Sequence, residues 1–310
     1  MLSVKDVSKS YSGHRALTDV SIEVPKQSIF GLLGPNGAGK TSLIRIVNQI
    51  TAPDSGQIFL DGEPLKARHV EQIGYLPEER GLYRKMKAGE QAIYLAQLKG
   101  MSKAEAKRIL KDWFEKFQIL EWWNKKVEEL SKGMAQKIQF ITTVMHNPKL
   151  LILDEPFSGF DPINTNLVKD ELMRLRDEGT TIILSTHNMG SVEEICEEIA
   201  LINKSKKILG GTVADIRKKY SKDIFRITFT GNMLDFTNAL WTNFELIEKD
   251  SEDDLNHVCK VKLLGDNTLN NLLQALIPAV EIKGVEELIP TMNEVFIAAV
   301  NEKMEEQSHE

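Results

Sequence analysis

The eight residues GPNGAGKT, at positions 34–41, restrict the fold of this chain more than any other feature. They fit the pattern G-x-x-x-x-G-K-[ST] without deviation, and they lie between an apolar segment at 29–33 and a helical pattern at 41–49. Glycines in such a loop let backbone N–H groups converge on phosphate oxygens, the lysine adds a mobile positive charge, and the threonine hydroxyl can bind Mg²⁺. The sequence therefore predicts a phosphate-binding loop between a strand and a helix.

A second segment with the properties of a phosphate-binding turn lies far downstream, in ELSKGMAQK at 129–137. Ser131 and Gly133 stand at an apparent helix start, where backbone N–H groups can bind an anion. Taken alone, Ser131 is also what an ordinary helix N-cap requires, and one side chain can serve both purposes. The sequence thus contains two candidate phosphate-binding turns in one chain.

Two adjacent carboxylates end the apolar run LLILDEP, whose composition is typical of a buried parallel strand. Burying Asp154 and Glu155 without compensation would cost several kcal/mol, so they indicate a cation or a proton-transfer task. Asp154 suits a Mg²⁺ ligand and Glu155 suits a group that polarises an attacking water. The alternative is a solvated pair of loop carboxylates.

His187 stands at the end of a second apolar run, TIILSTH, where it could bind a terminal phosphate. In isolation, a core histidine with satisfied hydrogen bonds is the preferred explanation. No role is assigned to the remaining histidines, which are His14, His69, His146, His257 and His309.

Bulk properties limit the classes of protein that this chain can belong to. Its 310 residues suggest about two domains, and its net charge of −6 makes it a poor general binder of nucleic acid. Its two cysteines, Cys196 and Cys259, are far apart in sequence and indicate a reducing cytosol. No apolar run approaches the ~20 residues that span a bilayer, so we expect a chain that does not cross a membrane by itself.

Strand and helix patterns divide the chain into three parts. Residues 1–220 alternate strand and helix signals, interrupted at about 86–146 by apolar residues at helical spacing. Residues 221–300 mix short strands and helices, which predicts a small α+β accessory domain. The polar tail at 301–310 is expected to be frayed.

The order of the motifs GPNGAGKT, LSKGM, LLILDEP, SGFD and STH resembles the ATP-binding cassette of ABC transporters, over roughly the first 220 residues. The resemblance implies an α/β fold of the P-loop NTPase type. In that fold a mixed sheet core carries a helical subdomain (about 86–146), and here the small C-terminal α+β domain follows. It also implies ATP and Mg²⁺ as cofactors, with Lys40, Glu155 and His187 as the catalytic residues.

In this family LSKGM resembles the signature motif, commonly LSGGQ, which caps the γ-phosphate bound by the opposite subunit. The resemblance therefore implies a head-to-tail homodimer or a paired cassette subunit. Tyr11 matches an aromatic residue that stacks on adenine, although an exposed turn tyrosine is a rival explanation. Asp161 in SGFD matches a loop that communicates across the dimer. The implied nucleotide contacts are Tyr11, Gly34, Pro35, Asn36, Gly37, Ala38, Gly39, Lys40, Thr41, Ser42, Ser131, Gly133 and Asp161, and the implied metal ligands are Thr41, Glu78 and Asp154.

Three residues depart from the family pattern. Glu78 replaces a glutamine, Lys132 replaces the first glycine of the signature, and Met134 replaces its glutamine. A carboxylate ~5 Å from another anion is repelled by ~3 kcal/mol at an effective dielectric near 20, so Mg²⁺ must offset Glu78. We expect Lys132 to point to solvent, and we expect hydrolysis to be retained because the catalytic residues are unchanged.

Three alternatives to a transporter ATPase fit the sequence less well. A GTPase would need a carboxylate that NKSK at 203–206 does not supply. A soluble ABC-type ATPase acting on a non-membrane partner, such as ribosomes or DNA, usually carries two cassettes or long coiled coils. An ATP-gated interaction module would lack the base, whereas Glu155 is present.

The segment LPEERGLY and the small C-terminal domain further resemble ATPase subunits of bacterial exporters, including a sodium-extrusion type. We therefore expect a cytoplasmic ATPase subunit, peripheral on the inner face of the cell membrane, that drives export by a separate integral membrane permease and binds no nucleic acid. The permease selects the transported substrate, so this chain does not encode it.

Overall fold

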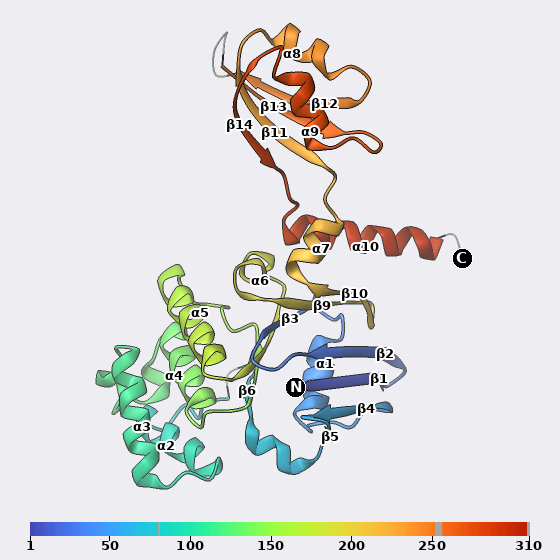
Figure 1. Cartoon of the computed structure of the whole chain (residues 1–310). Coiled ribbons are helices and arrows are strands. Elements are labelled where there is room, and N and C mark those ends of the chain that lie inside the picture. The colour runs from blue at the N-terminus through green and yellow to red at the C-terminus, as the bar shows by residue number, and fades with distance from the viewer. Residues whose placement is uncertain (80, 252–255, 309–310) are drawn as a thin grey trace. The chain divides into compact units, whose positions relative to one another are not determined.

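The structure of the chain is a computed structural model that describes residues 1–79, 81–251 and 256–308 (Figure 1). It divides into two compact units. The first unit contains Met1–Val213 together with Ala298–Glu310, and the second unit contains Ala214–Ile297. The domain limits 1–220 and 221–300 remain predictions from the sequence.

A six-stranded, mainly parallel sheet forms the centre of the first unit, with strand order β10-β9-β3-β8-β7-β6. Every residue of β3, β7 and β8 is buried, which is why these strands are continuous apolar runs in the sequence. Only β10 runs antiparallel to its neighbour. The strands are β3 (Ile29–Leu33), β6 (Ile73–Leu76), β7 (Leu150–Asp154), β8 (Thr181–Thr186), β9 (Glu198–Asn203) and β10 (Lys206–Thr212).

A second, antiparallel sheet in the first unit has the order β2-β1-β4-β5. Its strands are β1 (Leu2–Tyr11), β2 (His14–Val24), β4 (Ser55–Leu60) and β5 (Glu63–Pro64). Helix α1 (Lys40–Val47) contributes its buried apolar side chains to one core that also contains side chains of both sheets. This shared core fixes the start of α1, and with it the loop 34–41, against the central sheet.

Helices with an aromatic core form the insert predicted at about 86–146. They are α2 (Ala88–Leu98), α3 (Lys103–Lys116) and α4 (Lys132–Val144), with short 3₁₀ helices η2 (Leu120–Trp122) and η3 (Val127–Glu129) between them. The rings of Phe117 and Phe140 lie 5.7 Å apart and both are buried, so α3 and α4 share this core. The other helical segments of the first unit are η1 (Ala67–Gln72), α5 (Pro162–Asp177) and α6 (Met189–Ile195), and α7 (Val213–Lys219) follows at the boundary.

The second unit has its own antiparallel sheet, in the order β12-β13-β11-β14, and its own core. In β11 alternate side chains, such as Phe225, Ile227 and Phe229, are buried, and Phe229 stacks on Phe236 at 4.1 Å. The opposite face carries ion pairs such as Arg226–Glu286. The elements are β11 (Ile224–Thr230), α8 (Met233–Leu240), β12 (Phe244–Ser251), β13 (Asn256–Leu263), α9 (Leu269–Leu276) and β14 (Glu281–Glu287).

The C-terminal helix α10 (Met292–Ser308) is longer than the sequence pattern indicated. The polar tail that we expected to be frayed from residue 301 is helical as far as Ser308, and residues 309–310 lie outside the described part of the chain. Within the described residues, none of the helices combines the length and the apolar character needed to cross a bilayer.

Candidate functional site

The candidate site lies where the parallel strands of the central sheet end. The loop 34–41 follows β3, Glu78 follows β6, Glu155 follows β7 and His187 follows β8. These four strands are parallel, so their carboxyl ends meet at one edge of the sheet, where open α/β sheets bind ligands. A cavity of about 340 Å³ opens there, lined by Tyr11, His14, Ala16, Asn36, Gly37, Ala38, Gly39, Lys40, Thr41, Ser42, Glu78, Asp154 and Glu155.

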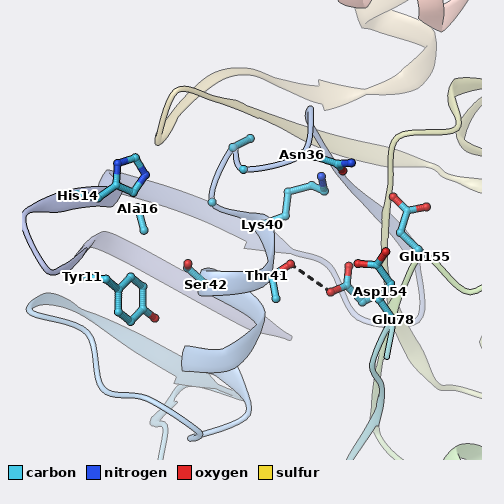
Figure 2. A pocket seen from close by; sticks show the side chains of 13 residues that line it. Tyr11, His14, Ala16, Asn36, Lys40, Thr41, Ser42, Glu78, Asp154 and Glu155 are labelled. Carbon is cyan, nitrogen blue, oxygen red and sulfur yellow. Dashed lines mark hydrogen bonds between the residues drawn. The ribbon is translucent and has the colours of Figure 1, made fainter. Parts of the chain in front are cut away.

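Figure 2 shows how the lining side chains are distributed. Tyr11 and His14 lie at one end, the carboxylates of Glu78, Asp154 and Glu155 lie at the other, and Lys40, Thr41 and Ser42 lie between them. The cavity is therefore apolar and aromatic at one end and densely charged at the other.

Two glycines give the loop 34–41 its path. Gly34 has φ 146° and a Cβ there would lie 2.1 Å from the carbonyl oxygen of Ile202. Gly39, with φ 116°, precedes the first helical residue, and a Cβ there would lie 2.3 Å from the carbonyl oxygen of Ala16. Any larger residue would push the loop away from β9 or from β2.

The ammonium of Lys40 lies folded back onto its own loop. It donates to the carbonyl oxygens of Gly34 at 2.7 Å and Pro35 at 3.2 Å, and it is almost fully buried. Burial lowers the pKa of Lys40, against the opposing effect of Glu155, Asp154 and Glu78. Lys40 is thus a poorly hydrated cation that faces anions, which is suited to binding phosphate.

Asp154 and Thr41 meet at the centre of the charged end. The Thr41 hydroxyl donates to Asp154 Oδ2 at 3.3 Å, and the Ser185 hydroxyl donates to Asp154 Oδ1 at 2.7 Å (Figure 2 shows the former). Burial raises the pKa of Asp154, although both hydrogen bonds oppose the rise. Nearby, burial and then the charge of Asp154 raise the pKa of Tyr75 to about 12. The two hydroxyls and the charge of Lys40 therefore compensate the buried negative charge of Asp154 only in part.

Glu155 is the most constrained residue of the site. Its backbone is in the left-handed region at φ 49°, and its N–H donates to the carbonyl oxygen of Ser185 at 2.8 Å. Its Oε1 accepts the backbone N–H of His187 at 3.0 Å and lies 2.6 Å from His187 Nδ1. His187 thus contacts Glu155, and its ring is not among the groups that line the cavity.

The aromatic end of the cavity lies across the turn between β1 and β2. Tyr11 and His14 are paired across the two strands, and Lys9 Nζ lies 5.5 Å from the centroid of the Tyr11 ring. Tyr11 is partly exposed, which is suited to stacking on a planar group.

Ser131, Gly133 and Asp161 do not line this cavity. Ser131 is the N-cap of α4 and accepts the N–H of Met134 at 3.3 Å. Asp161 is the N-cap of α5, where the N–H of Asn164 lowers the pKa of its carboxyl. The structure therefore gives both side chains a capping contact within their own chain.

The Lys132 side chain is exposed, as expected from the sequence, and its stem passes beside Gly159. A Cβ added to Gly159 would lie 2.6 Å from Lys132 Cε and 3.0 Å from its Cδ. Gln136, one turn further along α4, donates to the carbonyl oxygen of Ser158.

Sequence reasoning missed several residues of the site. His14 and Ala16 line the cavity, although no role had been assigned to His14. Ser185 and Thr186 bind the two adjacent carboxylates through their hydroxyls. The sequence offered one signal for them: both residues directly precede His187, in a predicted buried strand like LLILDEP.

Within the described residues, no group of three or more His, Cys, Asp or Glu side chains is arranged to hold a metal ion. The oxygen atoms of Thr41, Asp154 and Glu78 are nevertheless the ligand type that Mg²⁺ prefers. Because Mg²⁺ usually completes its coordination with water and substrate phosphates, a partial set of protein ligands is what such a site requires.

Comparison with known proteins identifies the family to which the chain belongs. Residues 17–158 match the family described as ABC transporter, and residues 211–300 match the C-terminal domain of DrrA1-3-like ATP-binding proteins. The uncharacterized ABC transporter ATP-binding protein YhaQ of Bacillus subtilis is 46% identical over 222 residues, which cover 72% of this chain and 74% of YhaQ. The linearmycin resistance ATP-binding protein LnrL of the same organism is 33% identical over 237 residues, covering 74% and 76% of the two chains.

Solved structures agree with this assignment. The ATP-binding subunit of an ABC transporter superposes with a TM-score of 0.67 at 30% identity, covering 71% of this chain and 93% of that one. The dimeric cassette MJ0796 bound to ADP and Pi, at 20% identity and a TM-score of 0.64, shares the fold. The chain therefore belongs to the ABC transporter family, as an ATP-binding and ATP-hydrolysing subunit with a DrrA-like C-terminal domain.

Proposed function

We propose that this subunit pairs head to tail on ATP and that hydrolysis in the pair drives export through a separate membrane permease. The observation that carries the proposal is the separation of two phosphate-binding turns within one chain. The loop 34–41, Asp154 and Glu155 share one cavity, while Ser131, Gly133 and Asp161 lie outside it. A second copy that presents its α4 N-terminus to this cavity would add donors that the chain does not provide to itself.

ATP fits the distribution of groups along the cavity. Its adenine would lie against Tyr11 at the aromatic end, and its phosphates would lie on the loop 34–41. Lys40 would exchange its carbonyl contacts to Gly34 and Pro35 for phosphate oxygens. Mg²⁺, when held by Thr41, Asp154 and Glu78, would neutralise charge that develops on the phosphates.

We assign the general base to Glu155. Its backbone strain and the donors around its carboxylate hold it in one place, so its orientation is set before the substrate arrives. His187 Nδ1 lies 2.6 Å from Glu155 Oε1, and its mostly exposed ring, which does not line the cavity, would contact a terminal phosphate by turning toward the cavity. Its role is to orient the base and the cleaved phosphate together.

The export direction and the membrane partner are supported by the relatives. LnrL is a resistance ATP-binding protein, and LptB of Escherichia coli, 33% identical over 221 residues, belongs to a lipopolysaccharide export system. We place this subunit at the inner face of the cell membrane, with the helical subdomain (about 86–146) and the Glu78 loop as the surface that contacts the permease.

The replacement Glu155→Gln tests the proposed chemistry. It removes the base while retaining shape, so ATP binding should persist, turnover should fall at least about a hundredfold, and an ATP-bound dimer should accumulate in size-exclusion chromatography. Glu115→Gln, the same change on an exposed part of α3, is the matched control and should behave like the parent. Parental turnover by Glu155→Gln would remove Glu155 from the role of base.

The proposed partner requires a separate test. Affinity purification of the full chain from solubilised membranes should recover a polytopic membrane protein in a fixed ratio. Recovery of ribosomes or DNA in place of such a protein would contradict the export proposal and leave the ATPase assignment intact.

A further inference from the structure

Two consecutive hydroxyls at the end of β8 face two consecutive carboxylates at the end of β7. The parallel register pairs Ser185 with Asp154. The Ser185 hydroxyl donates to Asp154 Oδ1 at 2.7 Å, and the Thr186 hydroxyl donates to Glu155 Oε2 at 3.1 Å. Both hydroxyl residues are fully buried, so water does not readily replace these donors.

The direction of the Thr186 hydroxyl is fixed by the backbone. Its oxygen accepts the N–H of Asn188 at 3.0 Å, and Asn188 is in turn the N-cap of α6, accepting the N–H of Ser191 at 3.1 Å. Since a hydroxyl has a single proton, occupation of its oxygen by this donor directs the proton to Glu155. The start of α6 therefore orients Thr186, and Thr186 orients the carboxylate.

The two oxygens of Glu155 have different partners. Oε1 contacts the backbone N–H and the ring of His187, whereas Oε2 accepts from Thr186. The His187 side chain is 65% exposed and is free to reorient, while Thr186 is 1% exposed and is not. Thr186 can consequently keep the Glu155 carboxylate in one orientation, even when the His187 ring changes its position.

We propose that Thr186 is a positioning residue for hydrolysis, which fixes the plane of the Glu155 carboxylate so that one oxygen faces the attacking water. Ser185 performs the corresponding task for Asp154. This inference rests on the proposed role of Glu155 as base. Thr186 itself touches neither the water nor the nucleotide in this scheme.

The test compares Thr186→Val, which keeps the branched shape, with Thr186→Ser, which keeps the hydroxyl. Misplacing the base should lower kcat about tenfold to a hundredfold in Thr186→Val, with the KM for ATP and the ATP-driven dimerisation unchanged. Thr186→Ser should recover most of the kcat. Thr181→Val is the matched control, because Thr181 is buried at the opposite end of β8 and binds Gln27 N–H at 2.9 Å, so its kcat should equal that of the parent.

Two results would overturn the inference. One is a parental kcat in Thr186→Val while Glu155→Gln is inactive, because the base would then need no help from this hydroxyl. The other is an equal loss of kcat in Thr186→Val and Thr186→Ser, which would show that packing and not the hydroxyl matters. Failure of the proposed function is distinct from both, since it appears as parental turnover in Glu155→Gln.

Discussion

Among single residues, Asp154 illustrates how an active site can oppose folding stability. It is buried, and that burial raises the pKa of its carboxyl above the ordinary value of 3.8 despite two hydroxyl donors. Asp154→Asn should therefore stabilise the nucleotide-free chain at pH 7 by on the order of 1 kcal/mol, as is common when a functional site is neutralised. Thermal unfolding without nucleotide measures this gain, and Mg²⁺-dependent turnover should be lost in the same variant.

The pH dependence of that gain follows from the direction of the shift. A carboxyl with a raised folded pKa favours folding below its unfolded pKa, and it loses that contribution as pH rises through the folded value. The stability difference between Asp154→Asn and the parent should thus shrink as pH falls through the raised folded pKa and toward 3.8, and it should reach its minimum well below 3.8, where the parent carboxyl is protonated in both states. A difference that grew on acidification would contradict the assignment of buried charge to Asp154.

Glu78 gives a second prediction about a single residue. It lies in the charged end of the cavity beside Asp154, where the family commonly has glutamine. Glu78→Gln removes one of the negative charges that attract a cation, so the Mg²⁺ concentration for half-maximal turnover should rise several-fold. Binding of metal-free ATP should tighten at the same time, because one anion no longer repels the phosphates. Exposed Glu79→Gln is the control, and equal metal dependence of Glu78→Gln and the parent would exclude Glu78 from the metal site.

Among the elements, the buried strands were the most predictable part of the fold. The apolar runs at 29–33 and 150–153 coincide with β3 and β7, because a strand covered on both faces has no polar positions to obscure the pattern. β1 and β12 were not predicted. β1 is rich in polar residues and has an irregular register with Asp6 at φ 50°, and half of the residues in the segment FELIEKDS of β12 are charged.

The candidate site was predictable only where a contiguous motif defines it. The loop 34–41 and the pair Asp154–Glu155 are each written in one short segment, with flanking strands that fix their placement. The roles of His14 and Thr186 depend on which strand lies beside which and in what register, as does the contact of Lys132 with Gly159. A single sequence does not contain that register, so such contacts need the folded structure.

The contact between α4 and the loop 158–161 permits a prediction for this pair of elements. Gly159→Ala should destabilise the chain mainly because its φ is +90°. The new Cβ meets only the far end of the flexible, exposed Lys132 side chain, which can move aside, so a double-mutant cycle with Lys132→Ala should give a coupling below about 0.5 kcal/mol. Gly179→Ala is the control, since its φ is +108° with open space around it, and it should show no coupling to Lys132. A coupling above about 1 kcal/mol between Lys132 and Gly159 would mean that the Lys132 side chain is held in place and does not move aside.

For the whole molecule, the decisive question is whether two chains complete each other's sites. Ser131 complicates the usual test, because it caps α4 and its removal could unfold the helix start at a cost of about 1 kcal/mol. Ser131→Asp avoids this difficulty, since aspartate caps a helix as well as serine does while its charge repels a phosphate. Ser102→Asp makes the same exchange at the N-cap of α3 and is the matched control for stability and turnover.

Mixing Ser131→Asp with Lys40→Ala then gives a prediction about pairing. Each variant alone should be inactive. In the Lys40→Ala homodimer both sites lack the lysine, and in the Ser131→Asp homodimer both sites have an aspartate that repels the phosphate at the start of α4. In a mixed pair the two defects fall in one site and the other site is intact, so an equal mixture should recover about a quarter of the parental turnover if pairing is random. Mixing Lys40→Ala with Glu155→Gln should recover nothing, because both changes disable the chain's own cavity and neither copy keeps a complete one. If the first mixture recovers no turnover despite demonstrated mixed dimers, the α4 start serves its own chain and hydrolysis does not require exchange between subunits. Recovery in the second mixture would instead show that Lys40 and Glu155 act in different sites.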